Sequence, residues 1–474
     1  MIVPDTRWQP DAPIAGQAKY KALAQAIREG IVSKQLTPGE KLPPVRDLAF
    51  KIGVTPGTVA RAYALLTDEG RLVAGVGRGT FVADTETSRP PPIGDAPLMY
   101  DTEDLPADKT QLISPVVPEF GQGEIIRDHL RGIAAGITSE ALMNYPSRQS
   151  DAASRQAEFD RLKEAPVGDL TVNDIIATNG GQNAISLILQ TVLHGHHPVV
   201  AMDELGYGGI RTMGTALRAE VLGIPWDDEG PDPNVFEHYI KTRGVQVFGT
   251  AAEINNPTVQ TTSARRRQDI ADLAQRYGVH VIDDDCFGRK HAERIGPSYR
   301  ELLPDLGWYV TSPSKTITPA LRIGFAVAPR GWATNLARTA TYNHFGVTRI
   351  ISDLYAAVAT DRRLPAIQEK VSKRYAQDIA GAVKILEGYD IKWAEDVPYL
   401  WLMLPDGWRA GAFKQAADAE GVVLKSAEDF TLRNGPSVQA VRVAVNGHYS
   451  HYRFIAAVRV LRRLLDHPLD QMSV

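Results

Sequence analysis

One short segment of the sequence joins an amine, two hydroxyl groups and a guanidinium. In TSPSKTITPALRIG, residues 311–324, Lys315 comes directly after Ser314 and three residues after Ser312, and Arg322 lies seven residues further on. A lysine amine can bond covalently to a carbonyl carbon, and hydroxyl and guanidinium groups can bind a phosphate. Taken alone, Lys315 would be an ordinary surface lysine.

Four other polar motifs follow apolar runs of the sequence. TNGGQNA contains Gly181 and Gln182, DELGYGG contains Tyr207, INNPT contains Asn256, and IDDDC contains Asp284. A glycine-rich loop before a helix is usually a tight turn and sometimes holds a phosphate at the helix N-terminus. INNPT could be an Asn-Pro turn, and IDDDC a solvated strand end or an oxygen site for a cation. Each motif alone leaves these interpretations open.

The elements that must position these residues are predicted from the hydrophobic pattern after about residue 112. The runs IIATNG, PVVAMD, GVHVIDDD, GWYVTS and RIGFAVA are expected strands, and QNAISLILQTVL and GGIRTMGTALRA are expected helices. This alternation predicts an α/β fold with a mainly parallel sheet and helices on both faces. Ligands in such folds bind at the carboxyl ends of strands, where Lys315, the glycine pair and the aspartate triplet all fall.

Pyridoxal phosphate would use these groups together. Its aldehyde needs an amine, its ring nitrogen needs a carboxylate, and its phosphate needs backbone N–H groups, hydroxyls and a cation. We expect Lys315 to supply the amine and Asp284 the carboxylate, with Tyr207 covering the ring. The expected phosphate donors are Gly181, Gln182, Ser312, Ser314 and Arg322. The pattern therefore predicts a pyridoxal 5'-phosphate site with Lys315 as its catalytic residue.

The N-terminal part of the chain has a different character. Residues 15–85 contain ten basic and six acidic side chains, a net charge of +4, although the whole chain carries -4. YKALAQAIREGIVSKQL, PVRDLAFKIG and TPGTVARAYALLTDEG predict three helices, the last capped by Thr55, and RLVAGVGRGTFVA predicts a two-stranded wing. A basic helix-turn-helix with a wing indicates double-stranded DNA as a partner. A small helical adaptor with a solvated basic face is the alternative.

The segment PGEKLPPVRDLAFKIGVTPGTVARAYALLTDEGRLVAGVGRGTFV resembles the winged-helix domain of GntR-type bacterial regulators. The resemblance implies that Arg46 binds a DNA phosphate. It also implies that the third helix, called the reading helix, contacts base edges, and that the tip of the wing contacts DNA. Family members often carry Arg or Asn early in the reading helix, where this chain has Pro56 and Gly57, which leaves Thr58 and Arg61 for direct readout. The implied DNA contacts are Arg46, Thr55, Gly57, Thr58, Arg61, Gly77 and Arg78.

From about residue 112 to 468 the chain is similar to fold-type I aminotransferase domains. TNGGQNA, DELGYGG, NNPT, VIDDDC, SPSKTITPALRIG and AVRVAVNG occur in the family's order. The resemblance implies that Lys315 forms the internal aldimine, that Asn256 bonds the ring hydroxyl, and that Arg442 binds the substrate carboxylate. Cys286 stands where the family usually has a tyrosine that donates to the ring hydroxyl, and a thiol is a weaker donor.

The chain thus combines an N-terminal winged helix-turn-helix, called the head, with an aminotransferase-like domain, called the body. This combination resembles the MocR subfamily of GntR-type transcriptional regulators. The resemblance implies a winged helix-turn-helix at 12–85, a proline-rich linker at 86–111 and an aminotransferase-like effector domain at 112–474. It also implies a regulator that senses an amino compound, with a carboxylate, through aldimine exchange at Lys315, and a head-to-tail homodimer. A working aminotransferase with an appended DNA-binding domain is one alternative. A DNA-binding protein whose body is a coenzyme-free dimerisation scaffold is another.

Composition bears on the cellular setting. The first residues lack a basic start followed by an apolar stretch, and no run of about 18 apolar residues occurs, so neither secretion nor membrane insertion is indicated. Cys286 is the single cysteine, which fits a reducing cytoplasm. We interpret LHGHH, residues 193–197, as a loop without a metal. The arginines of ARRRQDIADLAQ, residues 264–275, are expected to form a solvated helix face.

Overall fold

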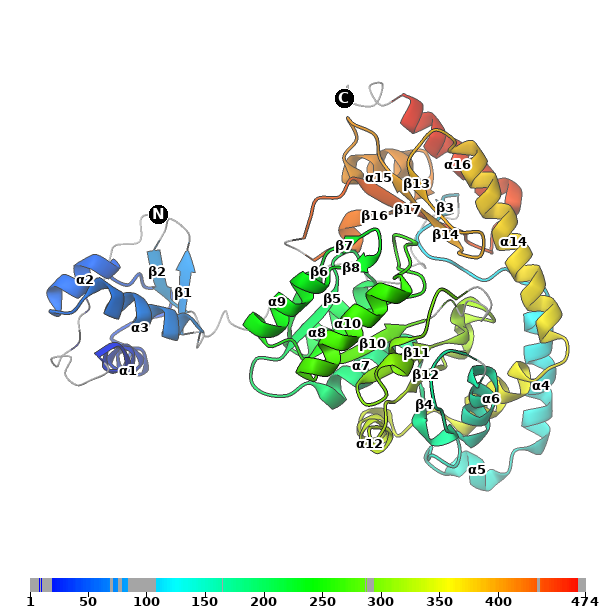
Figure 1. Cartoon of the computed structure of the whole chain (residues 1–474), viewed down its shortest axis with the longest axis horizontal. Coiled ribbons are helices and arrows are strands. Elements are labelled where there is room, and N and C mark those ends of the chain that lie inside the picture. Colours follow the sequence, from blue (N-terminus) through cyan, green and yellow to red (C-terminus); the bar gives the residue numbers. More distant parts are fainter. Residues whose placement is uncertain are drawn as a thin grey trace. The chain divides into compact units, whose positions relative to one another are not determined.

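The computed structural model describes residues 8, 10, 19–68, 71–75, 79–83, 108–163, 165–285, 287, 294–432 and 435–467 (Figure 1). The chain divides into two compact units, residues 1–105 and 106–474. Among the described helices, none is long and apolar enough to cross a membrane. Gly77, Arg78 and Cys286, and the predicted linker up to residue 107, lie outside the described residues.

The described part of the first unit contains three helices and a hairpin, as the hydrophobic pattern predicts. They are α1 Lys19–Val32, α2 Val45–Lys51, α3 Pro56–Asp68, β1 Leu72–Gly75 and β2 Gly79–Val82, with the two strands paired antiparallel. All five elements contribute to one core, which includes Leu23, Leu48, Val59, Leu72 and Val82. Because the described members of this core all belong to the first unit, that unit has its own source of stability.

The turn between α2 and α3 follows the capping signals of the sequence. Gly53 has a φ of +67°, a left-handed conformation that glycine adopts without steric cost. The Thr58 N–H donates to Oγ1 of Thr55 at 3.3 Å, and Pro56 is the first residue of α3. The two helices therefore form the helix-turn-helix that the sequence predicts.

A seven-stranded sheet forms the centre of the second unit. Its strands, in spatial order, are β4 Ile175–Thr178, β12 Gly324–Val327, β11 Gly307–Thr311, β10 His280–Asp284, β9 Val247–Thr250, β5 Val199–Asp203 and β6 Glu220–Ile224. β12 is antiparallel to both neighbours, and the other pairs are parallel. The predicted α/β class with a mainly parallel sheet is thereby confirmed.

Helices cover both faces of this sheet, as predicted. One face carries α7 Gly181–Val192, α8 Gly208–Ala216 and α12 Ala333–His344. The other carries α9 Pro233–Arg243, α10 Ala264–Tyr277, α11 Tyr299–Leu302, α6 Ala152–Leu162 and α13 Arg349–Ala359, and α4 Gln122–Gly136 and α5 Ser139–Met143 precede α6. The central strands are continuous apolar runs because both of their faces are buried.

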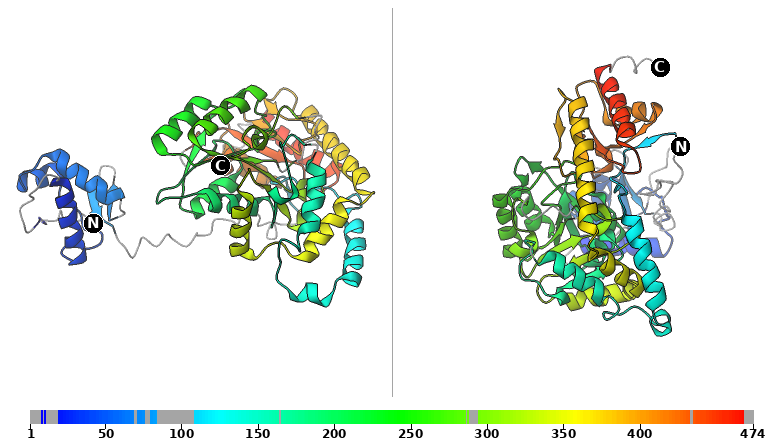
Figure 2. Two further views of the ribbon diagram at one scale, coloured as in Figure 1. Left: turned by 60° about the horizontal axis from the view of Figure 1, so that its bottom comes forward. Right: turned by 90° about the vertical axis from the view of Figure 1, so that its right-hand side faces the viewer.

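A second, antiparallel sheet with its own helices lies beside the first (Figure 2). Its strands, in spatial order, are β13 Ile391–Lys392, β14 Tyr399–Met403, β17 Ala440–Ala444 and β16 Lys425–Ser426. α14 Leu364–Ile385, α15 Ala410–Ala419 and α16 His451–Asp466 pack on one face of it. Two short pairs form separate two-stranded sheets: β3 Thr110–Gln111 with β15 Val422–Val423, and β7 Trp226–Asp227 with β8 Gly230–Pro231.

The arginines at the start of α10 correct one prediction, because two of the three do not form a solvated face. Arg266 and Arg267 are only 6% and 1% exposed. Arg267 pairs with Glu253 at 3.0 Å, and Arg266 pairs with Asp227 at 2.8 Å. Both guanidinium groups also donate to backbone carbonyls of neighbouring loops. Their burial depends on these distant partners, which the local sequence does not reveal.

Candidate functional site

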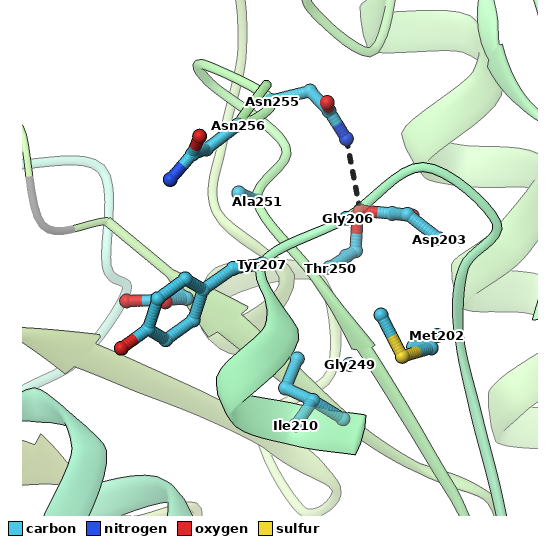
Figure 3. A pocket seen from close by; sticks show the side chains of 11 residues that line it. Met202, Asp203, Gly206, Tyr207, Ile210, Gly249, Thr250, Ala251, Asn255 and Asn256 are labelled. Carbon is cyan, nitrogen blue, oxygen red and sulfur yellow. Dashed lines mark hydrogen bonds between the residues drawn. The ribbon is translucent and has the colours of Figure 1, made fainter. Parts of the chain in front are cut away.

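A pocket lies where three parallel strands of the larger sheet end (Figure 3). Its lining includes Asp203, Thr250 and Asp284, the last residues of β5, β9 and β10, together with Tyr207 and Asn256. The carboxyl ends of adjacent parallel strands meet at one edge of a sheet, which explains how residues far apart in the chain converge. The structure thus brings together three residues predicted from the sequence, which are Tyr207, Asn256 and Asp284.

The three consecutive aspartates face different surroundings. Asp284 lines the pocket, whereas the Asp283 carboxylate accepts from the N–H groups of Tyr299 at 3.1 Å and Ala252 at 3.3 Å. Asp285 pairs with Arg294 and accepts from the Tyr309 hydroxyl at 2.5 Å. Burial raises the pKa of Asp283 to about 6. The alternation of a strand therefore gives Asp284 to the pocket and its two neighbours to structural bonds.

The two asparagines of INNPT are divided in the same way. Asn255 is buried, and its Nδ2 donates to the Asp203 carboxylate at 3.2 Å, which also accepts from Thr250 Oγ1 at 3.0 Å. The Asn255 Oδ1 accepts from the Thr258 hydroxyl at 2.9 Å and closes the turn. Burial raises the pKa of Asp203 to about 7. Asn255 fixes the loop, and Asn256 faces the pocket.

Lys315 lies at the end of a single 3-10 turn, Pro313–Lys315, that follows β11. The side chain is half-buried, and its Nζ donates to the Pro115 carbonyl at 2.8 Å. Ser312 caps the turn by accepting from the Ser314 N–H at 3.2 Å, and the two hydroxyl oxygens are 2.7 Å apart. The predicted amine and the two predicted hydroxyls are therefore held by one rigid turn.

The start of α7 and Arg322 come together although they lie far apart in the chain. Gly180 precedes Gly181, the first residue of α7, and has a φ of +94°. The Arg322 Nη2 donates to the Asn179 carbonyl at 3.3 Å. A Cβ added at Gly180 would lie 2.8 Å from the same guanidinium, so glycine is needed for this approach. The pairing of β4 with β12 brings these predicted phosphate donors together.

Tyr207 and Gln182 are bonded to each other. The Tyr207 hydroxyl donates to the Gln182 Oε1 at 2.8 Å, and the Gln182 Nε2 donates to the Gly209 carbonyl at 3.2 Å. Tyr207 is the residue before α8, and its ring borders the pocket (Figure 3). The bond holds the aromatic ring between the beginnings of α7 and α8. In this arrangement the Gln182 side chain positions Tyr207, which the sequence does not indicate.

Arg442, on the second sheet, is bonded to a residue that lines the pocket. It is 4% exposed, lies on β17, and donates to Asn256 Oδ1 and to the Ile113 carbonyl, both at 2.5 Å. Its guanidinium lies 4.7 Å from the centre of the Phe430 ring and 5.5 Å from that of Tyr399. The carbonyls that accept from Arg442 and from Lys315 both belong to the segment 113–115. No sequence motif pointed to this segment.

Some of the predicted DNA contacts in the first unit are exposed, and others contact neighbouring side chains. Arg46 is exposed on the first turn of α2. Thr55 and Thr58 are bonded through their hydroxyls at 2.9 Å at the start of α3, where Gly57 is exposed. The Arg61 guanidinium lies 4.3 Å from the centre of the Tyr20 ring, so α1 holds this side chain.

The aminotransferase class I and II family model matches residues 125–452. The chain belongs to this family. The model for bacterial regulatory proteins of the gntR family matches residues 19–82. A GntR head with an aminotransferase body makes the chain a MocR-type member of the GntR regulators, as the resemblance implied. The two family models thus match separate parts of the chain, one in each of its two compact units.

Relatives extend the match over nearly the whole MocR-type chain. It is 26% identical over 462 residues to the HTH-type transcriptional regulator YdeF of Bacillus subtilis, covering 97% of each chain. It is 25% identical to the HTH-type pyridoxine biosynthesis transcriptional regulator PdxR of Corynebacterium glutamicum, covering 66% of this chain and 67% of that protein. The kynurenine aminotransferase of Pyrococcus horikoshii has the same fold, with a TM-score of 0.66 and 21% identity over 77% of this chain and 92% of that chain.

Proposed function

We propose that this regulator binds pyridoxal 5'-phosphate in its second unit and senses an amino compound that carries a carboxylate. The proposal is supported chiefly by the convergence of Tyr207, Asn256 and Asp284 in one pocket of an aminotransferase fold, on a chain with a GntR head. It assigns DNA binding to residues 12–85, a spacer to 86–111 and sensing to 112–474. In this proposal the protein binds a double-stranded DNA operator and works as a head-to-tail homodimer in the cytoplasm.

The donor set in the second unit suits the coenzyme's phosphate. The first amide N–H groups of α7, at Gly181 and Gln182, have no partner within the helix because they belong to its first turn. A helix N-terminus favours a negative charge, and Arg322 adds a cation beside it. Ser312 and Ser314 supply hydroxyls from the turn that carries Lys315. An anion bound here would be surrounded by donors on several sides.

The remaining residues suit the coenzyme's ring. When bound, pyridoxal phosphate supplies an aldehyde that condenses with amines and a ring that accepts electrons. Lys315 presents the amine, and Asp284 holds a proton on the ring nitrogen because a carboxylate raises the pKa of a neighbouring base. Tyr207 excludes water from one face of the ring, and Asn256 orients the ring hydroxyl. Cys286, two residues after Asp284, would offer the ring hydroxyl a thiol, which is a weaker hydrogen-bond donor than the usual tyrosine.

The proposed binding of the effector uses the same residues. With the coenzyme bound, the amine of the effector would take the place of the Lys315 amine, which would be released as a free amine, and Arg442 would bind the carboxylate through two parallel hydrogen bonds. Arg442 belongs to the second sheet, and Asn256, to which it is bonded, belongs to the loop that follows β9 of the larger sheet. A ligand that contacts both residues would therefore connect both parts of the sensing unit. The effector can change DNA binding only by the difference in its affinity for two conformations of the protein.

Aminotransferase turnover is the second candidate function, because solved structures of this fold include the kynurenine aminotransferase. The two candidates make different use of the amine. A sensor releases its effector unchanged, whereas an aminotransferase passes the amino group to a 2-oxo acid. Continuous turnover with an amino donor and a 2-oxo acid would therefore favour the enzyme.

The first expected result is that borohydride fixes the coenzyme on Lys315. Reduction makes the lysine–coenzyme bond permanent, so peptide mass mapping of the full-length protein should find a single coenzyme adduct at this residue. Lys373, an exposed lysine on α14 paired with Glu369, is the internal control and should remain unmodified. An adduct on another lysine, or none after loading with pyridoxal phosphate, would contradict the proposed site.

The second expected result concerns the first unit, where Arg46→Ala should weaken binding to all DNA sequences alike. A side chain that neutralises one phosphate contributes roughly 0.9 to the slope of log affinity against log salt concentration. Titrations at several salt concentrations should therefore give a slope smaller by about this amount. Lys34→Ala removes an exposed charge outside α2 and α3 and serves as the control. An unchanged slope for Arg46→Ala would remove this residue from the interface.

A further inference from the structure

A group of cationic side chains surrounds Phe430, in the segment that leads from β16 towards β17. The Arg442 guanidinium and the Lys425 ammonium lie 4.7 Å and 5.9 Å from the centre of the Phe430 ring. Arg211 on α8 donates to the Thr431 carbonyl, and Lys414 on α15 pairs with Asp429 at 3.2 Å. We call Arg211, Lys414, Lys425 and Arg442 the Phe430 cluster.

Lys425 stands directly beside Arg442. The two residues are register partners on the antiparallel strands β16 and β17, so their side chains project from the same face of the sheet. Like charges at directly opposite positions repel each other. Burial and then Arg442 lower the pKa of Lys425, while Asp429 partly offsets them. The charged form of Lys425 is therefore less favourable here than in water, and a further anion beside it would stabilise that charge.

The other members of the cluster have hydrogen-bond or ion-pair partners. Among the residues that the structure describes, the Lys425 side chain forms no hydrogen bond and no ion pair, and its ammonium faces the Phe430 ring. The Asp429 carboxylate pairs with Lys414 and accepts from the Ser426 N–H at 2.9 Å, so its bonds go elsewhere. Arg211 is bonded to the carbonyls of Asp429 and Thr431. Lys425 is thus a half-buried ammonium whose donors remain available to a ligand.

The cluster adjoins the pocket. Arg442 is bonded to Asn256, which lines the pocket, and Arg211 lies one helical turn after Tyr207. The Gly206 N–H donates to the Phe430 carbonyl at 3.2 Å, which fastens the segment around Phe430 to the loop before Tyr207. A molecule that places one acidic group on Arg442 therefore has Lys425 beside that group, on the same face of the second sheet.

We propose that the effector is an amino acid with a second acidic group, which Lys425 binds while Arg442 binds the first. The inference rests on the proposed function, because it assumes that the effector enters the same pocket. A second acidic group separates the two like charges and gives the Lys425 ammonium the ion-pair partner that the described residues do not supply. A neutral amide of the same shape lacks the negative charge and cannot do this.

The test compares acidic amino acids with their amides on the full-length protein loaded with pyridoxal phosphate. Calorimetry should show that glutamate or aspartate binds at least about tenfold more tightly than glutamine or asparagine, the factor expected for one hydrogen bond to a charged group. Lys425→Met should reduce this preference to less than about twofold. Lys425→Gln is a second, polar variant that guards against a folding defect. Lys414→Met is the matched control, since Lys414 is already paired, and should keep the preference.

Two results would overturn the inference: a wild-type protein without the preference, or a Lys425→Met protein that retains it. Glutarate, which has both acidic groups and no amine, separates this inference from the proposed function. If glutarate binds more tightly than its monoamide and Lys425→Met abolishes the difference, the acidic subsite stands even where no amine changes the coenzyme spectrum. If amines change the spectrum but acids and amides bind equally, the proposed function stands and the acidic subsite is wrong.

Discussion

Lys315→Ala should abolish the response to effector while the protein still binds operator DNA. The coenzyme loses its covalent attachment, so the absorbance of the lysine-bound form should disappear completely from the purified protein. DNA binding should persist because the described core of the first unit draws on its own helices and hairpin alone. Absorption spectra and electrophoretic mobility shifts, each with and without effector, measure the two properties on one sample.

The control for Lys315→Ala is Lys373→Ala, which removes an exposed lysine from α14 and should respond as the wild type does. Both variants must have the circular dichroism spectrum of the folded protein. Lys315 donates a hydrogen bond to the Pro115 carbonyl, and the loss of a bond of this kind costs about 1 kcal/mol, a small part of the stability of a unit of this size. A folded Lys315→Ala protein that responds at the same effector concentration would refute sensing through this amine.

The pocket could be anticipated because its residues follow apolar strands. Asp284, Tyr207 and Asn256 each come soon after a run long enough for a buried strand, and parallel strands end at a common edge. Local alternation also separates Asp284 from its two neighbours. The helix-turn-helix was equally accessible, since Gly53 and Thr55 carry their capping signals in the sequence itself.

Contacts made through backbone atoms and strand register could not be anticipated. Any residue has a carbonyl, so the acceptors at Ile113 and Pro115 leave no mark in the sequence. The pairing of Lys425 with Arg442 depends on the register of two strands in the second sheet. Arg211 could be associated with the site from the sequence, because it lies on a predicted helix that begins directly after Tyr207 and follows Tyr207 by four residues, about one helical turn.

Arg442→Ala should weaken the response to effector by roughly 2 to 5 kcal/mol, about 30-fold or more in effector concentration. The loss is large because Arg442 is 4% exposed, so a carboxylate beside it would be desolvated together with the guanidinium. Coenzyme absorbance should remain, since the proposed coenzyme contacts lie on the larger sheet and its loops. Arg442→Lys keeps the positive charge but loses the planar fork, so its effect should be intermediate.

A structural role of Arg442 must be separated from carboxylate binding, because the guanidinium also holds Asn256 and the Ile113 carbonyl. The separating ligand is an amine that matches the effector but lacks its carboxylate. Carboxylate binding predicts that Arg442→Ala weakens the effector while the wild type and the variant bind this amine alike, as measured by the change in coenzyme absorbance. A purely structural role predicts that both ligands weaken by the same factor. Equal weakening would therefore remove Arg442 from the effector site, because a lost carboxylate contact cannot affect a ligand without a carboxylate.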